Sequence, residues 1–157
     1  MRGTRLAGDF GEYYTALCLL NSGGWREPDI LDSKGIDLAA YPTDEDKPAL
    51  GISVKTRNVA NTENPSILLR KKDITYCFKE AKARKLEPCF SFVIIGNGSL
   101  DILVLTLDSL IEERQVIDAF DVRTGEFARE TLSIPISKNA RERWGKYDNI
   151  FHLLLKQ

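Results

Sequence analysis

The sequence has few of the residues on which redox and histidine-based enzymes depend. Among its 157 residues there are one histidine, one methionine and three cysteines. The single histidine, His152, excludes a multi-histidine metal site, and its leucine-rich surroundings argue against a histidine-based catalytic triad. Cys18, Cys77 and Cys89 are far apart and each has apolar neighbours. We therefore expect buried, reduced thiols and neither disulfides nor a zinc site.

Long apolar runs and a strong net charge are also missing. No stretch approaches the roughly 18 apolar residues that span a bilayer. Residues 1–5 lack the apolar stretch and the cleavage site of a signal peptide. The formal net charge is −1, so a nucleic-acid-binding surface would have to be local. These absences predict a cytoplasmic protein that does not contact membranes.

What the chain does contain is typical of one folded domain. Hydrophobic residues make up 43% and charged residues 29% of the sequence, enough for a buried core and a polar surface. There are no internal repeats, and the glycines within 23–24 and 96–98 are turn signals rather than a phosphate-binding loop. We expect a single domain over residues 1–157, with a core of about 5–106 and a C-terminal extension of about 107–157.

The hydrophobic pattern predicts alternating helices and strands. Apolar residues at three- and four-residue steps from Leu6 to Leu20 predict an amphipathic helix over residues 6–21, with its apolar face toward a core. Residues 89–95 are almost all apolar, as in a strand buried on both faces. The other expected strands are 30–31, 36–41, 50–55, 100–105 and 132–134, and the other expected helices are 71–85, 108–113, 138–144 and 149–155. This order predicts an α/β (α+β) fold with a mixed central sheet flanked by helices.

Two charged side chains stand inside the expected strands 36–41 and 50–55. They are Asp37 in one strand and Lys55 in the next. An ionised group is costly to bury unless it is paired or bound to a metal. In an antiparallel pair the two side chains can project to one side, where a carboxylate suits Mg²⁺ or Mn²⁺ and a lysine can orient water or stabilise phosphate charge. The pattern therefore indicates metal-assisted phosphodiester hydrolysis.

These residues resemble the motifs of the PD-(D/E)XK nuclease superfamily, which includes Holliday-junction resolvases and many restriction endonucleases. The matching segments are Gly11-Glu12, Gly35-Ile36-Asp37 and Ile52-Ser53-Val54-Lys55. The expected order of elements from residue 6 to about 95 also agrees with the core of that family. The resemblance implies a restriction-endonuclease-like fold and hydrolysis of DNA with Mg²⁺ (or Mn²⁺) as cofactor.

The resemblance also implies a role for each matching residue. Asp37 would be a metal ligand, Lys55 the catalytic lysine, and the backbone carbonyl of Val54 a further ligand. Glu12 matches the helix glutamate of resolvase-like members, where it faces the site and can hold metal. Ser53 would be a hydrogen-bonding member of the site, and it departs from the family pattern, which usually has Asp or Glu there.

The missing acid leaves several interpretations open. Some restriction endonucleases of the superfamily carry Ser-X-Lys and supply the acid from the following helix, which here offers Asp73 and Glu80. Glu63 in the preceding loop and Glu12 in the first helix are the other candidates. Alternatively, the site is degenerate and the fold binds nucleic acid or protein without cutting. An RNA-cleaving toxin on the same fold is a third interpretation.

Basic residues that follow the Lys55 strand are expected to contact phosphates. Residues 70–85 hold seven basic and two acidic side chains, a local charge of +5 in a nearly neutral chain. Such groups beside an acidic metal site can hold the backbone of a nucleic acid. The resemblance to the nuclease superfamily implies DNA rather than RNA as the partner. The expected binding residues are Arg57, Arg70, Lys71 and Lys72. The sequence leaves a homodimer open.

Overall fold

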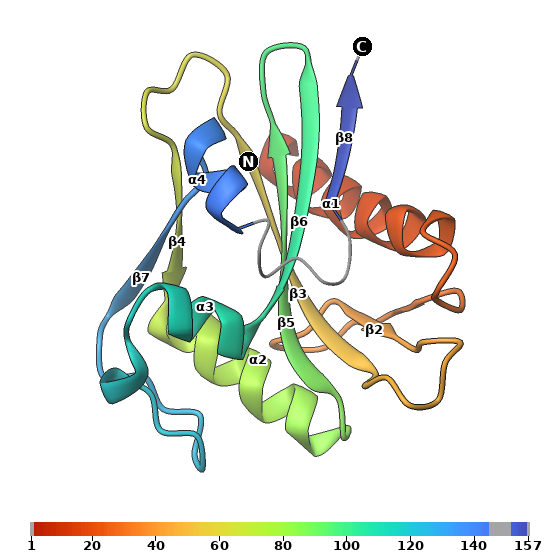
Figure 1. Cartoon of the computed structure of the whole chain (residues 1–157), viewed down its shortest axis with the longest axis vertical. Coiled ribbons are helices and arrows are strands. Elements are labelled where there is room, and N and C mark those ends of the chain that lie inside the picture. Colours follow the sequence, from red (N-terminus) through yellow and green to blue (C-terminus); the bar gives the residue numbers. More distant parts are fainter. Residues whose placement is uncertain (1, 145–151, 157) are drawn as a thin grey trace.

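A six-stranded sheet forms the centre of the molecule and helices lie on both of its faces (Figure 1). The computed structural model describes residues 2–144 and 152–156, and only the backbone of 2–4 and 152–156. The helices are α1 (Arg2–Asn21), α2 (Lys71–Ala83), α3 (Leu107–Glu113), the 3₁₀ helix η1 (Ile117–Ala119) and α4 (Lys138–Trp144). The strands are β1 (Asp29–Ile30), β2 (Leu38–Ala40), β3 (Leu50–Asn58), β4 (Ser66–Arg70), β5 (Glu87–Ile95), β6 (Ser99–Thr106), β7 (Thr131–Pro135) and β8 (His152–Lys156).

The sheet is mixed, as the sequence predicted. Its strand order is β1-β2-β3-β5-β6-β8, and β3 with β5 is the parallel pair. The neighbouring pairs, β2 with β3 and β5 with β6, are antiparallel. A parallel pair needs a crossover connection, and α2 lies within the segment that links β3 to β5. The antiparallel hairpin of β4 and β7 forms a second, small sheet.

Alternate residues of the central strands face two different helical layers. Phe90, Phe92 and Ile94 of β5 belong to the large core that α2 and α3 cover. Val93 of the same strand faces α1, where it clusters with Tyr14 and other buried residues. A strand buried on both faces reads as a continuous apolar run, which explains why residues 89–95 were recognisable in the sequence.

Helix α1 packs on the sheet through small side chains. A Cβ atom at Gly11 would overlap Thr56 Oγ1 of β3, so only glycine permits this approach. One turn later, Thr15 Oγ1 donates to the Gly11 carbonyl at 2.8 Å and lies 2.8 Å from Ser91 Oγ of β5. The prediction that the large apolar residues of α1 face the core was therefore wrong in part. Tyr14 is 8% exposed, but Leu6 is 69% exposed.

The C-terminal helix expected over residues 149–155 is wrong for the described part of that segment. Residues 152–156 form β8, which pairs antiparallel with β6 at the edge of the sheet. Residues 149–151 lie outside the described part of the chain. A short leucine-rich run fits a helix or a strand equally well, and the open edge of β6 selects the strand. The strand β4 was also missed, although β7 was expected near its observed place.

Hydroxyl side chains cap two of the short helices. Thr106 caps α3 by accepting a hydrogen bond from the Ser109 N–H at 3.1 Å. The α4 helix begins after Ser137, whose Oγ accepts from the Ala140 N–H at 3.3 Å. All three cysteines are free and buried. Within the described segments no helix has the length and apolar character needed to cross a membrane.

Candidate active site

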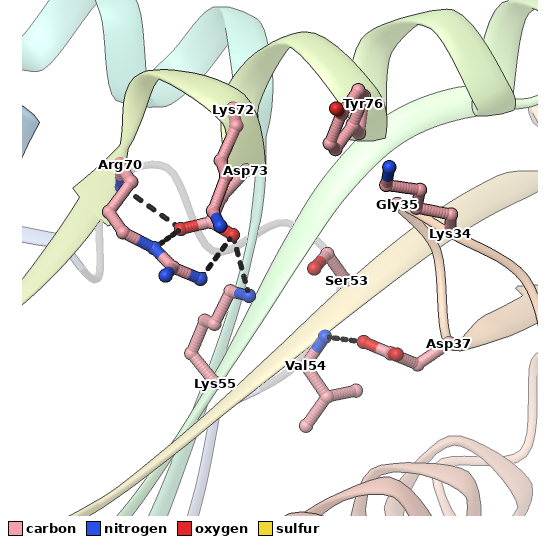
Figure 2. Close-up of a pocket in the computed structure, with 10 residues that line it drawn as sticks. All are labelled: Lys34, Gly35, Asp37, Ser53, Val54, Lys55, Arg70, Lys72, Asp73 and Tyr76. Atoms are coloured by element: carbon pink, nitrogen blue, oxygen red, sulfur yellow. Dashed lines mark hydrogen bonds and ion pairs between the residues drawn. The ribbon is translucent and has the colours of Figure 1, made fainter. Parts of the chain in front are cut away.

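Asp37 stands at the edge of the sheet where the β2–β3 ladder ends. Its N–H donates to the Ile52 carbonyl at 2.8 Å, and its own carbonyl accepts from the Leu31 N–H at 2.8 Å. These bonds hold the backbone of Asp37 one residue before β2 begins. Its carboxylate Oδ2 accepts a hydrogen bond from the Val54 N–H at 2.6 Å (Figure 2). The side chain thus takes the place that a neighbouring strand would otherwise fill.

The strand register brings three of the predicted residues together. Leu38 pairs with Ile52 at the last step of this ladder, and Asp37 lies just before it, where its carboxylate accepts hydrogen bonds from the Val54 N–H and the Ser53 hydroxyl. Residues two apart on a strand share a face, so Lys55 points to the same side as Ser53. The backbone at Val54 lies between them. The expected projection of Asp37 and Lys55 to one side of neighbouring strands agrees with this geometry.

The peptide at Val54 faces the open edge of β3. In an extended strand the N–H and the carbonyl of one residue point to the same edge. The N–H of Val54 meets Asp37, so its carbonyl is directed toward the same edge, beyond the last β2–β3 pair. This is the position from which a backbone oxygen can serve a cation held by Asp37.

Lys55 is paired with an acid from the second helix. Its Nζ lies 3.6 Å from Asp73 Oδ1. Asp73 also accepts from the Arg70 backbone N–H and from Arg70 Nε, both at 3.0 Å, and from the second guanidinium nitrogen at 3.2 Å. The Asp73 side chain is 13% exposed. Asp73 therefore fixes the first turn of α2 and restrains Lys55 at once.

A pocket of about 270 Å³ connects these groups (Figure 2). Asp37 and Asp73 lie on opposite sides of Ser53, which is 4% exposed. Gly35 belongs to the wall: it has φ +115°, and a Cβ there would lie 2.5 Å from the Tyr76 carbonyl oxygen. Glycine is needed at this point because both the conformation and the close approach to α2 exclude a side chain.

The positive groups around Asp37 do not fully offset the cost of burying its negative charge. Burial raises the pKa of its carboxyl group above the ordinary value. The Val54 N–H, the Lys55 ammonium and the Ser53 hydroxyl each act to lower that pKa, but burial prevails. A cation close to Asp37 would therefore be stabilising.

Glu12 approaches the same carboxylate from α1, on the other face of the sheet. It follows Gly11, the residue in closest contact with β3, and its side chain is half-buried. Its pKa is raised, first by burial and next by the negative charge of Asp37. The charge of Asp37 therefore disfavours the ionised form of Glu12, and a cation close to both side chains would offset that effect.

Asp73 has the opposite electrostatic character. Burial by itself would raise the pKa of its carboxyl group, but the hydrogen bonds from Arg70 and the charge of Lys55 lower it on balance. Its negative charge is already compensated by two basic side chains. Of the candidate replacements for the missing acid, Asp73 is therefore already paired with Arg70 and Lys55, whereas burial and the charge of Asp37 disfavour the ionised form of Glu12.

These donors fit a hard divalent cation of the size of Mg²⁺ or Mn²⁺. Such ions bind through one or two carboxylates and keep several waters. The pocket has room for such waters, since one water takes about 30 Å³ in the liquid. No group of three or more His, Cys, Asp or Glu side chains in the described part of the chain could hold a metal. The candidate donor set therefore stays at two carboxylates, Asp37 and Glu12, with the Val54 carbonyl.

The remaining predicted residues divide into near and distant ones. Arg70 and Lys72 line the pocket. Lys71 and Arg57 are exposed and lie outside that lining. Among the other acids considered, Glu80 pairs with Arg84 at 2.8 Å and Glu63 lies in an exposed loop, so the structure does not bring either of them to Asp37.

Two lining residues were not identified from the sequence. The ammonium of Lys34 lies 4.4 Å from the centroid of the Tyr76 ring, and both residues border the pocket. Tyr76 follows Asp73 by three residues on α2, so the helical spacing alone would have placed the two on one face. Lys34 precedes Asp37 by three residues in a loop, and nothing in the sequence marks that loop as facing α2.

No protein-family model and no curated protein matches the chain by sequence. In three dimensions the chain is similar to the solved structure of Hjc, a Holliday junction resolvase from Archaeoglobus fulgidus, an archaeal hyperthermophile. The match covers 88% of this chain and 95% of the resolvase, with a TM-score of 0.52 and 13% sequence identity. At that identity the likeness concerns the fold. The chain therefore has a restriction-endonuclease-like fold, as expected from the sequence.

Proposed function

We propose that the protein is a metal-dependent nuclease that hydrolyses phosphodiester bonds in DNA. The observation that carries the proposal is the grouping of Asp37, Ser53 and Lys55 around one pocket, where the Val54 N–H holds the Asp37 carboxylate. DNA is the proposed substrate because the structural neighbour is a Holliday junction resolvase. The basic side chains of Arg70 and Lys72 at the rim suit a phosphate backbone.

Each residue has a proposed task. Asp37, Glu12 and the Val54 carbonyl are the proposed ligands of Mg²⁺ or Mn²⁺, an ion that lowers the pKa of bound water and offsets phosphate charge. Lys55 presents its ammonium to the attacking water or to the phosphate undergoing cleavage. The Ser53 hydroxyl donates a hydrogen bond to the Asp37 carboxylate. It is not proposed as a metal ligand in place of the missing carboxylate.

Asp73 is a proposed positioning residue. The 3.6 Å pair with Lys55 limits the rotamers of a long, flexible side chain, and Arg70 in turn holds Asp73. A lysine fixed in this way loses less conformational entropy when it meets the phosphate. Loss of Asp73 should therefore lower the catalytic rate without removing the metal.

Cleavage of DNA by purified variants tests the proposal. Four-way junctions, linear duplex, single strands and an RNA control are incubated with Mg²⁺, with Mn²⁺ or with EDTA. We expect cleavage by the wild type with metal only, and its loss in Asp37→Ala and Lys55→Ala. Matched controls in an exposed loop, Asp44→Ala and Lys47→Ala, should cut like the wild type. Equal trace cleavage by wild type and Lys55→Ala would indicate a contaminant and refute the proposal.

A second candidate function is a nuclease fold that binds nucleic acid or protein without cutting it. The observation in its favour is that Lys55 is already neutralised by Asp73, while no three-acid group is found among the described residues. This candidate predicts binding that is indifferent to divalent metal. Binding of the same DNA panel with and without EDTA, measured by fluorescence anisotropy, distinguishes the two functions.

A further inference from the structure

The outer face of α1 carries a regular row of exposed apolar side chains. Its five members are Leu6, Phe10, Tyr13, Leu17 and Leu20, here called the α1 seam. Their exposed fractions are 69%, 43%, 64%, 53% and 47%. The opposite face of the same helix is buried on the sheet, where Tyr14 and Leu19 are 8% and 0% exposed. The helix is therefore apolar on two faces, and only one of them has a partner within the described part of the chain.

The spacing of the α1 seam is that of a helix–helix contact. Its members follow one another at intervals of four, three, four and three residues, the a/d pattern of a coiled-coil surface. A helix that packs only on a sheet needs one apolar face, which α1 already has. Phe10 is also held in place, since its ring stacks on that of Tyr14 with centroids 5.6 Å apart. The row is thus both regular and partly pre-arranged.

We propose that the α1 seam is the dimer interface of this protein and that its occupant is α1 of a second copy, running antiparallel. Tyr13 stands in the middle of the row with two large apolar residues on either side. A two-fold axis at Tyr13 sets Leu6 near Leu20 of the partner and Phe10 near Leu17. A self-complementary patch of this kind is what a two-fold symmetric contact requires.

Charge favours the antiparallel direction. The acidic and basic side chains of α1 lie in its first half, between Arg2 and Glu12, while residues 13–21 carry none. Antiparallel pairing sets each charged half against a neutral half. Parallel pairing would instead set the two charged halves beside each other, with the exposed Asp9 of both copies in the same half of the contact.

The size of the patch suits a dimer of modest strength. Five large side chains about half exposed present on the order of 500 Å², at the upper end of the largest apolar patch on a typical monomer. Two copies would bury about 1,000 Å² in total, near the lower bound for a specific interface. Helix α2 lies on the other face of the sheet from α1 (Figure 1). The pocket beside Asp37 is lined by residues of α2 and none of α1, so dimerisation through the α1 seam leaves it open.

Sedimentation velocity between about 1 and 50 μM tests the proposal with the full chain. The wild type should sediment as a dimer, and Leu17→Glu as a monomer with native circular dichroism. Because each dimer loses two buried leucines, the dissociation constant of the dimer should rise at least about 100-fold. The control Leu68→Glu, at a residue 60% exposed on β4, should remain dimeric.

Crosslinking tests the position of the axis. Tyr13→Cys should form a covalent dimer with a short bis-maleimide, and Leu68→Cys should not. The native cysteines are buried, so the introduced thiol is the one that reacts. A monomeric wild type at 50 μM, or a Leu17→Glu protein that still dimerises, would overturn the proposal. A monomer that Leu17→Glu destabilises would instead show that another segment of the same chain covers the seam.

Discussion

Replacing Ser53 with aspartate should make the stability of this protein depend more strongly on divalent metal. Ser53 is 4% exposed, and its hydroxyl is hydrogen-bonded to the Asp37 carboxylate. An aspartate there adds a second carboxylate at the position that most PD-(D/E)XK nucleases use. Without a cation, the new charge faces Asp37, whose pKa is already raised by burial.

The expected size of the effect follows from Coulomb's law. Side chains directly across an antiparallel pair lie about 5 Å apart. At an effective dielectric constant of about 20, two negative charges at that distance repel by about 3 kcal/mol. This is a large part of the 5–15 kcal/mol by which domains are typically stable, but it leaves the protein folded. A divalent cation bound to both carboxylates would remove this repulsion.

Urea unfolding at pH 7.5 in EDTA and in Mn²⁺ measures this effect. In EDTA we expect Ser53→Asp to be about 3 kcal/mol less stable than Ser53→Asn, which has the same shape without the charge. In saturating Mn²⁺ the gap should fall below about 1 kcal/mol, because both variants bind the ion but only in Ser53→Asp does the bound ion also cancel the repulsion of about 3 kcal/mol. A control at Ser91, buried on the opposite face, should be destabilised equally in both solutions. A gap between the two Ser53 variants that Mn²⁺ leaves unchanged would refute a metal at this site.

Two further predictions concern the elements that support the site. Gly11→Ala should destabilise the protein by about 1–2 kcal/mol, since overlap with Thr56 Oγ1 outweighs the better helix propensity of alanine. In equilibrium unfolding, a second substitution Thr56→Ala should restore the lost stability, whereas Thr56→Ser, which keeps the oxygen, should not. Asp73→Asn should cost about 1 kcal/mol at pH 7 in EDTA, because the isostere cannot carry the charge that Lys55 compensates. The lowered pKa of Asp73 means that its charge stabilises the fold above the unfolded pKa of about 3.9 and stops doing so as the pH falls through the folded value. Unfolding curves of wild type and Asp73→Asn should therefore converge below about pH 4, and a gap of constant size would contradict this origin.

Much of the central sheet was predictable because its signals are local. The apolar run over residues 89–95 predicts a strand without reference to the rest of the chain. The short apolar segments around Asp37 and Lys55 do so as well. Register then follows from the short polar loop between β2 and β3, which pairs Leu38 with Ile52 and so brings Asp37 close to Ser53. The site residues on these strands were therefore accessible from the sequence together with the family motifs.

What the sequence did not reveal depends on long-range packing. The large apolar residues of α1 obey the helical period, but close contact with the sheet is made by Gly11 and Thr15, whose small side chains carry no strong apolar signal. The leucines at 153–155 become a strand because β6 offers a free edge. The role of Asp73 depends on how α2 lies over β3, and no local pattern distinguishes it from Glu80.

Calorimetric titration of Mn²⁺ into the wild type, Asp37→Asn, Glu12→Gln and Asp73→Asn tests the central claim most directly. The account predicts that the wild type binds Mn²⁺ and that the Asp37 and Glu12 variants bind at least about tenfold more weakly, a loss of about 1.4 kcal/mol each. Asp73→Asn should bind within about threefold of the wild type, since Asp73 is already paired with Lys55 and Arg70. Absence of binding by the wild type, or binding that depends on Asp73 and not on Glu12, would contradict the account.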